Sequence, residues 1–352
     1  MNSPSREDDI SWEKEKNYRR ITCLFIVELG DQLQRGQPKQ SARGAVAASA
    51  ACMLFHRFYT MQSFAKHNRF IIGATCLFLA MKIEDCPRKV EHIITCYCNA
   101  RQLKNPSEQV LKELREQIIV AERVVLHTLC FDFQLDHPIG LCVMKVKTDL
   151  KSNIPDERKV EFVNTALNFL NDSIGTTLSV LYPASKIALG AIFLASLQLD
   201  IAPILSRQHQ SQQIHSIGLS WFQLIRKDID AEALKDICFQ MIEVYEFQRK
   251  SSSRSNKRVD VNVEVLKREV DQLRSAPTEA SNGSFVRAQL DAGSQDRNSK
   301  NSDMTRTTPK SSVREGERDG YGDDFDDDDV WEAPPSSKPP SVQVSVFGSG
   351  GR

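Results

Sequence analysis

The sequence lacks a net charge and lacks a membrane-length apolar run. Its 352 residues carry 46 lysines and arginines against 46 aspartates and glutamates. Such a chain has no general attraction to nucleic acid or to an anionic membrane, so that kind of binding would need a local patch. No apolar stretch reaches the roughly 18–20 residues of a membrane span, and the start, MNSPSREDDISWEKEK, is too polar for a signal peptide. We expect a soluble intracellular protein.

Signatures of catalysis and metal binding are missing as well. No GxGxxG, P-loop, HExxH or GxSxG motif occurs. The nine cysteines form no CxxC pair, and Cys96 and Cys98 lack zinc-ligand spacing. Their odd number and their scatter through apolar runs argue for a reducing compartment, in which a thiol behaves as a small hydrophobe. We expect no enzyme activity, no metal and no cofactor.

What the sequence has is one amphipathic helix after another up to about residue 250. A first series is expected at 17–33, 40–61, 68–83, 89–100 and 110–130, and a second at 139–147, 159–181, 184–199, 220–226 and 231–247. The third helix repeats in letters, because FLAMKIED at Phe78–Asp85 returns as FLASLQLD at Phe193–Asp200. The two copies lie 115 residues apart. This distance exceeds the ~20–50 residues of a solenoid repeat and predicts two like domains.

The expected organisation is an N-terminal segment at 1–16, a first repeat at 17–135, a second repeat at 136–250 and a tail at 251–352. The tail is rich in Ser, Asn, Asp, Arg and Gly and has little apolar material, so we expect it to be disordered. The exception is a short amphipathic helix at 259–276. The run DDFDDDDVWEAPP is interpreted either as a solvating segment or as an acidic–aromatic docking motif.

Lys82 is the residue of the first repeat that packing does not explain. It follows the uncharged run 70–81, and the matching position of the second repeat is Leu197. One interpretation is a lysine whose stem covers apolar surface while its charge stays in water. The other is a lysine–carboxylate pair that points at a partner. The candidate acids are Glu84, Asp85, Glu91 and Glu122, of which Glu122 interrupts the apolar face of IIVAERVVLHTL, and spacing alone does not choose among them.

Tandem five-helix repeats that carry LFLAMKIED and AERVVLHTLCFDF resemble the cyclin box fold. HRFYTMQSF (56–64), KIEDCPRKVEHII (82–94), FDFQLDHP (131–138) and NDSIGTTLS (171–179) narrow the resemblance to the transcriptional cyclins, cyclin T most and cyclin K next. It covers residues 2–245. The resemblance implies an all-α fold of two tandem five-helix cyclin-box repeats, followed by the disordered tail.

The resemblance also implies a regulatory subunit of a cyclin-dependent kinase. In the family, the lysine of the LAxKxEE segment forms a pair with a glutamate of the fifth helix, and both bind backbone groups beside the kinase's regulatory C helix. These positions fall on Lys82 and Glu122. The neighbouring apolar contacts map to Leu79, Ile83, Leu126, Phe131 and Phe133. A subunit that binds only the active orientation of the C helix shifts the kinase toward it, so that the kinase's own Lys–Glu pair completes the ATP site.

The sequence departs from the cell-cycle cyclins in its first helix. YRRITCLF keeps Arg19 but has Thr22 and Phe25 in place of the leucine and tryptophan of an MRAIL-type docking patch, so we expect no such groove. His56 stands where those cyclins place an aspartate that pairs with the arginine, and that salt bridge is not expected here. QRKSSSRSNKRVD, after the second repeat, has no cysteine, so we do not expect the capture of a viral activator and RNA.

The implied function is that of a nuclear, P-TEFb-like cyclin whose kinase acts on the C-terminal repeats of RNA polymerase II. Two alternatives stay open: a cyclin K- or L-like partner of another transcriptional or splicing-linked kinase, and a TFIIB-type DNA-binding factor. Zero net charge and the missing zinc ribbon argue against the last, and no direct nucleic-acid binding is expected. RKSSSRSNKR (249–258) is interpreted as a signal for nuclear accumulation or as a solvated linker. Ser3-Pro4 and Thr308-Pro309 are candidate proline-directed phosphorylation sites.

Overall fold

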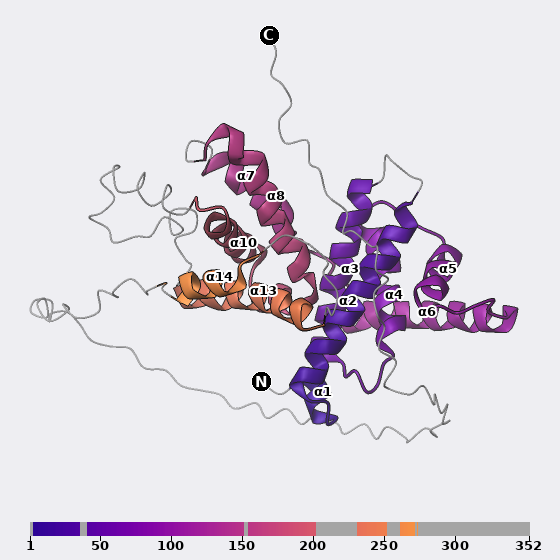
Figure 1. Cartoon of the computed structure of the whole chain (residues 1–352). Coiled ribbons are helices and arrows are strands. Elements are labelled where there is room, and N and C mark those ends of the chain that lie inside the picture. The colour runs from indigo at the N-terminus through magenta and orange to yellow at the C-terminus, as the bar shows by residue number, and fades with distance from the viewer. Residues whose placement is uncertain are drawn as a thin grey trace, which may run out of the picture. The chain divides into compact units, whose positions relative to one another are not determined.

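The computed structural model describes residues 3–35, 41–150, 154–201, 231–251, 261–271 and 273, which belong to one compact unit. Its elements are α1 (Pro4–Glu7), α2 (Trp12–Gln34), α3 (Ser41–Met61), α4 (Arg69–Ile83), α5 (Val90–Ala100), α6 (Glu108–Thr128), α7 (Pro138–Thr148), α8 (Asp156–Asp172), η1 (Ser173–Gly175), α9 (Leu178–Leu181), α10 (Ala184–Gln198), α13 (Ala231–Ser251) and α14 (Val263–Asp271) (Figure 1). These ranges contain helices and no strand, which confirms the all-α expectation.

Helix α4 is the centre of the first repeat. Every residue from Phe70 to Met81 is buried, and the helix packs against α2, α3, α5 and α6 (Figure 1). A helix that is apolar on all sides has to be surrounded in this way. Asn68 starts it, because its side-chain oxygen accepts hydrogen bonds from the backbone N–H groups of Phe70 and Ile71.

Helix α10 has the same role in the second repeat. It packs against α7, α8, α13 and α14, and eleven of its residues are buried. The residues that match between α4 and α10, Phe78 with Phe193, Leu79 with Leu194 and Ala80 with Ala195, are buried in both helices. Each repeat therefore has its own hydrophobic core around an equivalent central helix, as the repeated letters predict.

The helix expected at 159–181 is wrong as a single element. Helix α8 ends at Asp172, and the turn η1 and the short helix α9 follow it. In the turn, Ser173 Oγ donates to the backbone carbonyl of Leu170, and Thr176 Oγ1 donates to that of Ser173. Hydroxyls that bond the backbone locally compete with helix continuation, and the apolar periodicity on both sides conceals the break.

Two helices near the ends of the expected repeats differ from the sequence expectation. Helix α2 begins at Trp12 and not at residue 17, because Ser11 Oγ accepts a hydrogen bond from the N–H of Lys14. Helix α14 forms within the expected range 259–276, but it is part of the second core, where Val263, Leu266 and Val270 are buried. The helix expected at 220–226 and the disorder expected at 252–260 and 274–352 lie outside the described residues.

Helices α2 and α3 of the first repeat contact the second repeat through several side chains. His56 Nε2 donates to the carbonyl of Ile174 at 2.9 Å. Lys16 Nζ lies 2.7 Å from Glu243 Oε1, and the guanidinium of Arg20 lies 4.1 Å from the ring centre of Phe247. The turn η1 and helix α13 thus connect the two repeats through polar and aromatic groups, and Ile174 of η1 also packs against the first core.

Candidate partner-binding site

Lys82 and Glu122 form an ion pair between α4 and α6. Lys82 Nζ donates to Glu122 Oε1 at 2.6 Å, and the two side chains are 42% and 16% exposed. Lys82 lies in the last turn of α4, where the helix dipole favours a positive charge. The pair is preformed, and its polar atoms still reach solvent.

The other candidate acids have different positions. Glu84 Oε1 lies 3.3 Å from His137 Nε2, and Glu91 Oε1 lies 3.2 Å from Arg115 Nε. Asp85 follows the end of α4 in a left-handed conformation, with φ of 52°. Of the acids that spacing left open, the structure brings Glu122 to Lys82.

Phe78 is a part of the site that the sequence argument placed only in the core. The Nζ of Lys82 lies 3.9 Å from the centre of its ring, one helical turn away on α4. An ammonium group over an aromatic face gains about 0.5–1 kcal/mol at an exposed site. The spacing of four residues was the available signal, since side chains at i and i+4 lie on one face of a helix.

The mapped apolar residues lie at different depths. Leu79 is buried in the first core at 5% exposure, so it supports the surface from beneath. Ile83, Leu126 and Phe133 are partly buried and pack against the same core. Phe131 is 59% exposed and is the residue of this set that offers most of its surface to a partner.

The backbone after α6 holds Phe131 in this exposed position. Cys130 and Phe131 have φ of 51° and 57°, a left-handed conformation that is unfavourable for residues with a Cβ. Two hydrogen bonds oppose this cost, from Phe131 N to Leu126 O at 3.0 Å and from Asp132 N to Leu129 O at 2.9 Å. Asp132 also pairs with Arg57 of α3 at 2.6 Å. Strained backbone that its surroundings enforce is frequent at functional sites.

Ile119 is a second residue that the sequence argument missed. It lies three positions before Glu122 and seven before Leu126 on α6, a spacing that puts all three on one face. Its side chain is 38% exposed. The apolar surface around the ion pair therefore extends one turn further toward the start of α6 than the mapped set.

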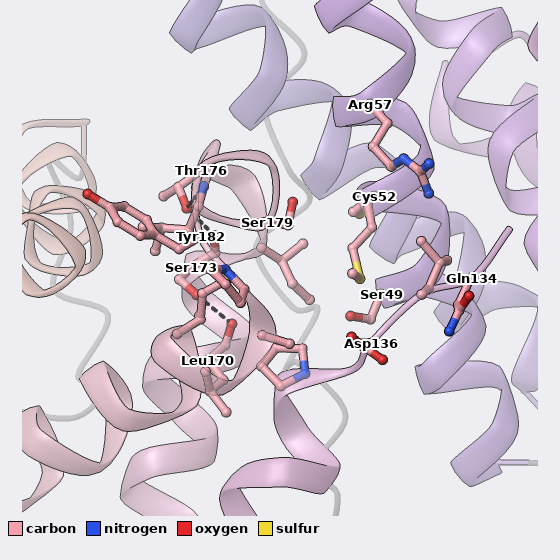
Figure 2. A pocket seen from close by; sticks show the side chains of 18 of the residues that line it. Ser49, Cys52, Arg57, Gln134, Asp136, Leu170, Ser173, Thr176, Ser179 and Tyr182 are labelled. Carbon is pink, nitrogen blue, oxygen red and sulfur yellow. Dashed lines mark hydrogen bonds between the residues drawn. The ribbon is translucent and has the colours of Figure 1, made fainter. Parts of the chain in front are cut away.

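A cavity of about 270 Å³ lies between α3, the segment after α6 and the turn before α10. Ser49 and Cys52 face Ser173, Thr176 and Tyr182 across it (Figure 2). The Ser173 and Thr176 hydroxyls donate to backbone carbonyls of their own turn. In the described ranges, no three His, Cys, Asp or Glu side chains are placed to hold a metal ion.

One cysteine–histidine pair comes close enough to raise the question of catalysis. Cys23 Sγ lies 3.3 Å from His56 Nε2, but both residues are 1% exposed. The imidazole is also bonded to the carbonyl of Ile174. A substrate could not reach this pair without opening the core, so its geometry is that of packed interior groups.

The described helices also contain none that is long and apolar enough to cross a membrane. The fold is a helical scaffold of two repeats, and its first repeat carries a preformed ion pair at its surface.

Comparisons with known proteins give this scaffold its family. A family profile, the N-terminal domain of cyclins, matches residues 2–134. The chain is 32% identical to Cyclin-T1-4 of Arabidopsis thaliana over 260 residues, which are 72% of this chain and 43% of the relative. It is 30% identical to human Cyclin-L1 over 285 residues, 79% of this chain and 47% of the relative. It is 32% identical to Cyclin-K of Danio rerio over 244 residues, 68% and 52% of the two chains.

The chain belongs to the cyclin family and, within it, to the transcriptional cyclins. It spans about half the length of the curated relatives it matches. Its fold is shared with a chain of the crystal structure of the yeast RNA Pol II CTD kinase CTDK-1 complex, with a TM-score of 0.56 and 15% identity over 76% of this chain and 79% of that chain. The predicted cyclin box fold is confirmed.

Proposed function

We propose that this chain is the non-catalytic regulatory subunit of a cyclin-dependent kinase and that the kinase binds at the Lys82–Glu122 pair. The observation that carries the proposal is the 2.6 Å ion pair, which is formed in the free chain and is partly exposed. Around it lie Ile83, Leu126, Phe131 and Phe133, with Leu79 beneath. The catalytic groups belong to the partner.

The geometry supports activation through the kinase's regulatory C helix. A charge pair that is already formed loses little side-chain entropy on binding, and its free lone pairs and N–H groups can bond backbone groups at a helix end. The apolar rim, with Phe131 as its most exposed member, would exclude water from those bonds, as at interface hot spots. Selective binding to the active orientation of the C helix shifts the kinase population toward activity.

The finer proposal is a P-TEFb-like role, in which the kinase phosphorylates the C-terminal repeats of RNA polymerase II and promotes elongation in the nucleus. The similarity to cyclins named T and K supports it. A cyclin L-like role with another transcriptional or splicing-linked kinase is the alternative, because human Cyclin-L1 is nearly as similar and matches over more of this chain.

Affinity purification of the full chain, with identification of the bound kinase, tests both the general proposal of a kinase subunit and the finer P-TEFb-like role. Lys82→Glu, and Glu122→Ala combined with Phe131→Ala, are expected to abolish kinase recovery while circular dichroism stays helical. Lys104→Glu is the matched control, because it reverses an exposed lysine outside the site. Kinase recovery with both site variants would show that the interface lies elsewhere, and the identity of the kinase decides between the two roles.

The nuclear part of the proposal has a separate test. Deletion of residues 249–258 is expected to weaken nuclear accumulation of a fluorescently tagged chain. Unchanged accumulation would identify the segment as a solvated linker. Residues 252–258 of this segment lie outside the described residues.

A further inference from the structure

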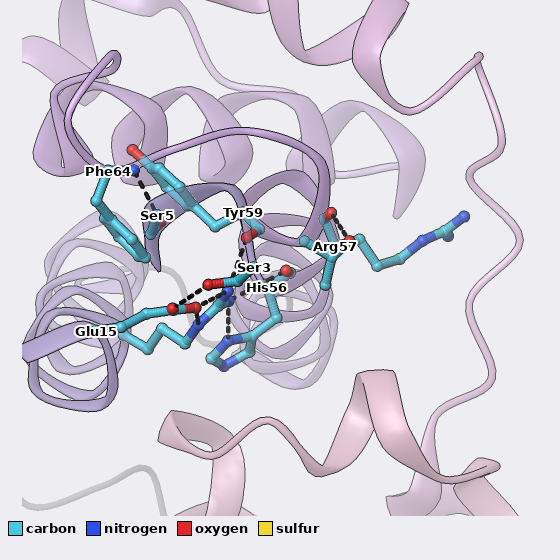
Figure 3. Close-up of polar contacts among 9 residues, drawn as sticks. Ser3, Ser5, Glu15, His56, Arg57, Tyr59 and Phe64 are labelled. Atoms are coloured by element: carbon cyan, nitrogen blue, oxygen red, sulfur yellow. Dashed lines mark hydrogen bonds and ion pairs between the residues drawn. The ribbon is translucent and has the colours of Figure 1, made fainter. Parts of the chain in front are cut away.

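The hydroxyl of Ser3 is bonded to a buried carboxylate of α2. Ser3 Oγ donates to Glu15 Oε2 at 2.6 Å (Figure 3), and Glu15 is 1% exposed. Ser3 is the residue before α1, but its side chain makes no capping hydrogen bond there. The hydroxyl is therefore used for the contact with Glu15 and not to begin the short helix.

The other oxygen of Glu15 is bound by Arg19, and Arg19 has no donor left. A guanidinium has five N–H groups. Those of Arg19 make five hydrogen bonds: two to Glu15 Oε1, one each to the carbonyls of His56 and Tyr59, and one to His56 Nδ1. Since both residues are buried, Glu15 depends on Ser3 to satisfy its second oxygen.

Other side chains also hold the residues around Ser3. We call residues 3–10 the N-terminal strap. Ser5, which is fully buried, accepts a hydrogen bond from the N–H of Phe64 at 3.1 Å. Asp8 Oδ2 lies 3.3 Å from Lys66 Nζ, and Ile10 packs against the first core. Of these polar contacts between the strap and the first repeat, the Ser3–Glu15 bond is the shortest.

We propose that Ser3 is a phosphorylation site for a proline-directed serine/threonine kinase and that phosphate at Ser3 detaches the N-terminal strap. Pro4 follows Ser3 directly. In the reaction, Ser3 Oγ attacks the γ-phosphorus of ATP, and a new O–P bond forms as the bond to the β,γ-bridging oxygen breaks. ADP leaves, and the hydroxyl proton passes to the base of the kinase.

The phosphate would replace the attractive hydrogen bond between Ser3 and Glu15 by a repulsion between two negative charges. It removes the only hydrogen that the side chain donates, and it places a charge of about −1.5 to −2 next to the Glu15 carboxylate. Elsewhere an arginine could compensate this charge, but Arg19 would have to give up bonds to Glu15, His56 or Tyr59. Glu15 is buried and Ser3 is partly buried, so water screens the repulsion between the phosphate and the Glu15 carboxylate only in part.

The attached strap also protects Ser3 from the kinase. Its hydroxyl is engaged by Glu15, and Pro4 already lies in the first turn of α1. The kinase therefore acts on the detached population, and the phosphate then traps that population. This site is separate from the proposed kinase interface, which lies on α4 and α6.

Phosphoserine placed genetically at position 3 of the full chain tests the effect of the phosphate. Backbone amides of Arg6 and Ile10, which bond within the strap, and of Phe64 are expected to exchange hydrogen at least about tenfold faster than in the unmodified chain. Phosphoserine at position 148 is the control, because Thr148 of α7 is exposed and its hydroxyl also donates to a carboxylate, that of Asp149, far from Glu15 in the sequence and in the other repeat. Unchanged or slower exchange with phosphoserine at position 3 would overturn the proposal.

A second experiment tests access. The full chain is incubated with ATP and a purified proline-directed kinase, and phosphate at Ser3 is measured by mass spectrometry relative to Thr308, the internal reference. Ser5→Ala removes the acceptor of the Phe64 bond and leaves Ser3 intact, so the Ser3-to-Thr308 ratio is expected to rise severalfold. Thr148→Ala, at an exposed residue of α7, is expected to leave it unchanged. Equal ratios in Ser5→Ala and the wild type, or no phosphate at Ser3 in either, would contradict the proposal.

Discussion

The Lys82–Glu122 pair is expected to contribute little to folding and much to partner binding. Lys82→Leu is the informative substitution, because the second repeat carries Leu197 at the matching position of its central helix. Glu122→Gln keeps the size and most of the hydrogen bonding of Glu122 but removes its charge. Together with the double variant they form a mutant cycle, which isolates the interaction between the two side chains from the other effects of each change.

The expected magnitude follows from the exposure of the pair. Exposed ion pairs are worth about 0.2–1 kcal/mol. With Lys82 at 42% and Glu122 at 16% exposure, a coupling free energy of about 1 kcal/mol is expected at the upper end of that range. Loss of the contact with Phe78 adds about 0.5–1 kcal/mol, so Lys82→Leu should cost about 1–2 kcal/mol. From a typical stability of at least about 5 kcal/mol, this leaves less than about 1% of the chains unfolded.

Urea unfolding followed by circular dichroism gives the four free energies of the cycle, and recovery of the kinase on each variant gives the binding effect. The expected pattern is a small coupling in the free chain together with loss of the kinase from all three variants. Leu79→Ala is the contrasting variant, because this buried residue should cost about 2–5 kcal/mol of stability. A cost above about 4 kcal/mol for Lys82→Leu, or full kinase recovery on folded Lys82→Leu, would refute the reasoning.

Three further outcomes are expected in thermal or urea unfolding. Leu266→Ala should destabilise the second repeat by about 2–5 kcal/mol, whereas Val265→Ala, at an exposed neighbour on the same helix, should change little. Gly190→Ala should cost about 1–3 kcal/mol, because a Cβ there would lie 2.4 Å from a methyl group of Ile237. Burial and the charge of Glu28 raise the pKa of Asp31 to about 6, so its ionisation opposes folding as the pH rises from about 4 to about 6. Asp31→Asn should therefore stabilise the chain by about 1 kcal/mol at pH 7, after allowance for solvent screening, and not at pH 4; a gain of equal size at both values would contradict this cause.

The fold was largely predictable, because the spacing of the apolar residues indicates helices and their recurrence along the chain indicates two repeats. Helix α4 is uncharged from Phe70 to Met81, and only burial on every side accommodates that pattern. The break after Asp172 was not predictable from periodicity, since it depends on hydroxyls of Ser173 and Thr176 that bond local carbonyls. The place of α14 was not predictable either, because an amphipathic pattern shows that a helix has an apolar face but not what covers it.

The site was predictable in part. Packing logic singled out Lys82, and the family resemblance chose Glu122 among four acids, which the 2.6 Å contact now supports. Spacing could not supply the exposure of each residue. Leu79 and Phe131 were placed in one apolar set, yet Leu79 is buried and Phe131 is 59% exposed. That difference comes from the left-handed backbone at Cys130 and Phe131. This stretch contains no glycine, the residue that usually indicates a left-handed conformation in a sequence.

The two repeats carry different side chains at the matching position of their central helices. In α10, Leu197 follows Phe193 by four residues and packs against the second core. In α4, Lys82 follows Phe78 by the same interval, and its ammonium group lies over the Phe78 ring. Side chains four residues apart lie on one face of a helix, so Lys82 reaches the ring of Phe78. Its ammonium group also donates a hydrogen bond to Glu122. Because a lysine at this position contacts the Phe78 ring and adds an ion pair open to solvent, the first repeat presents a charge pair at its surface without giving up its core.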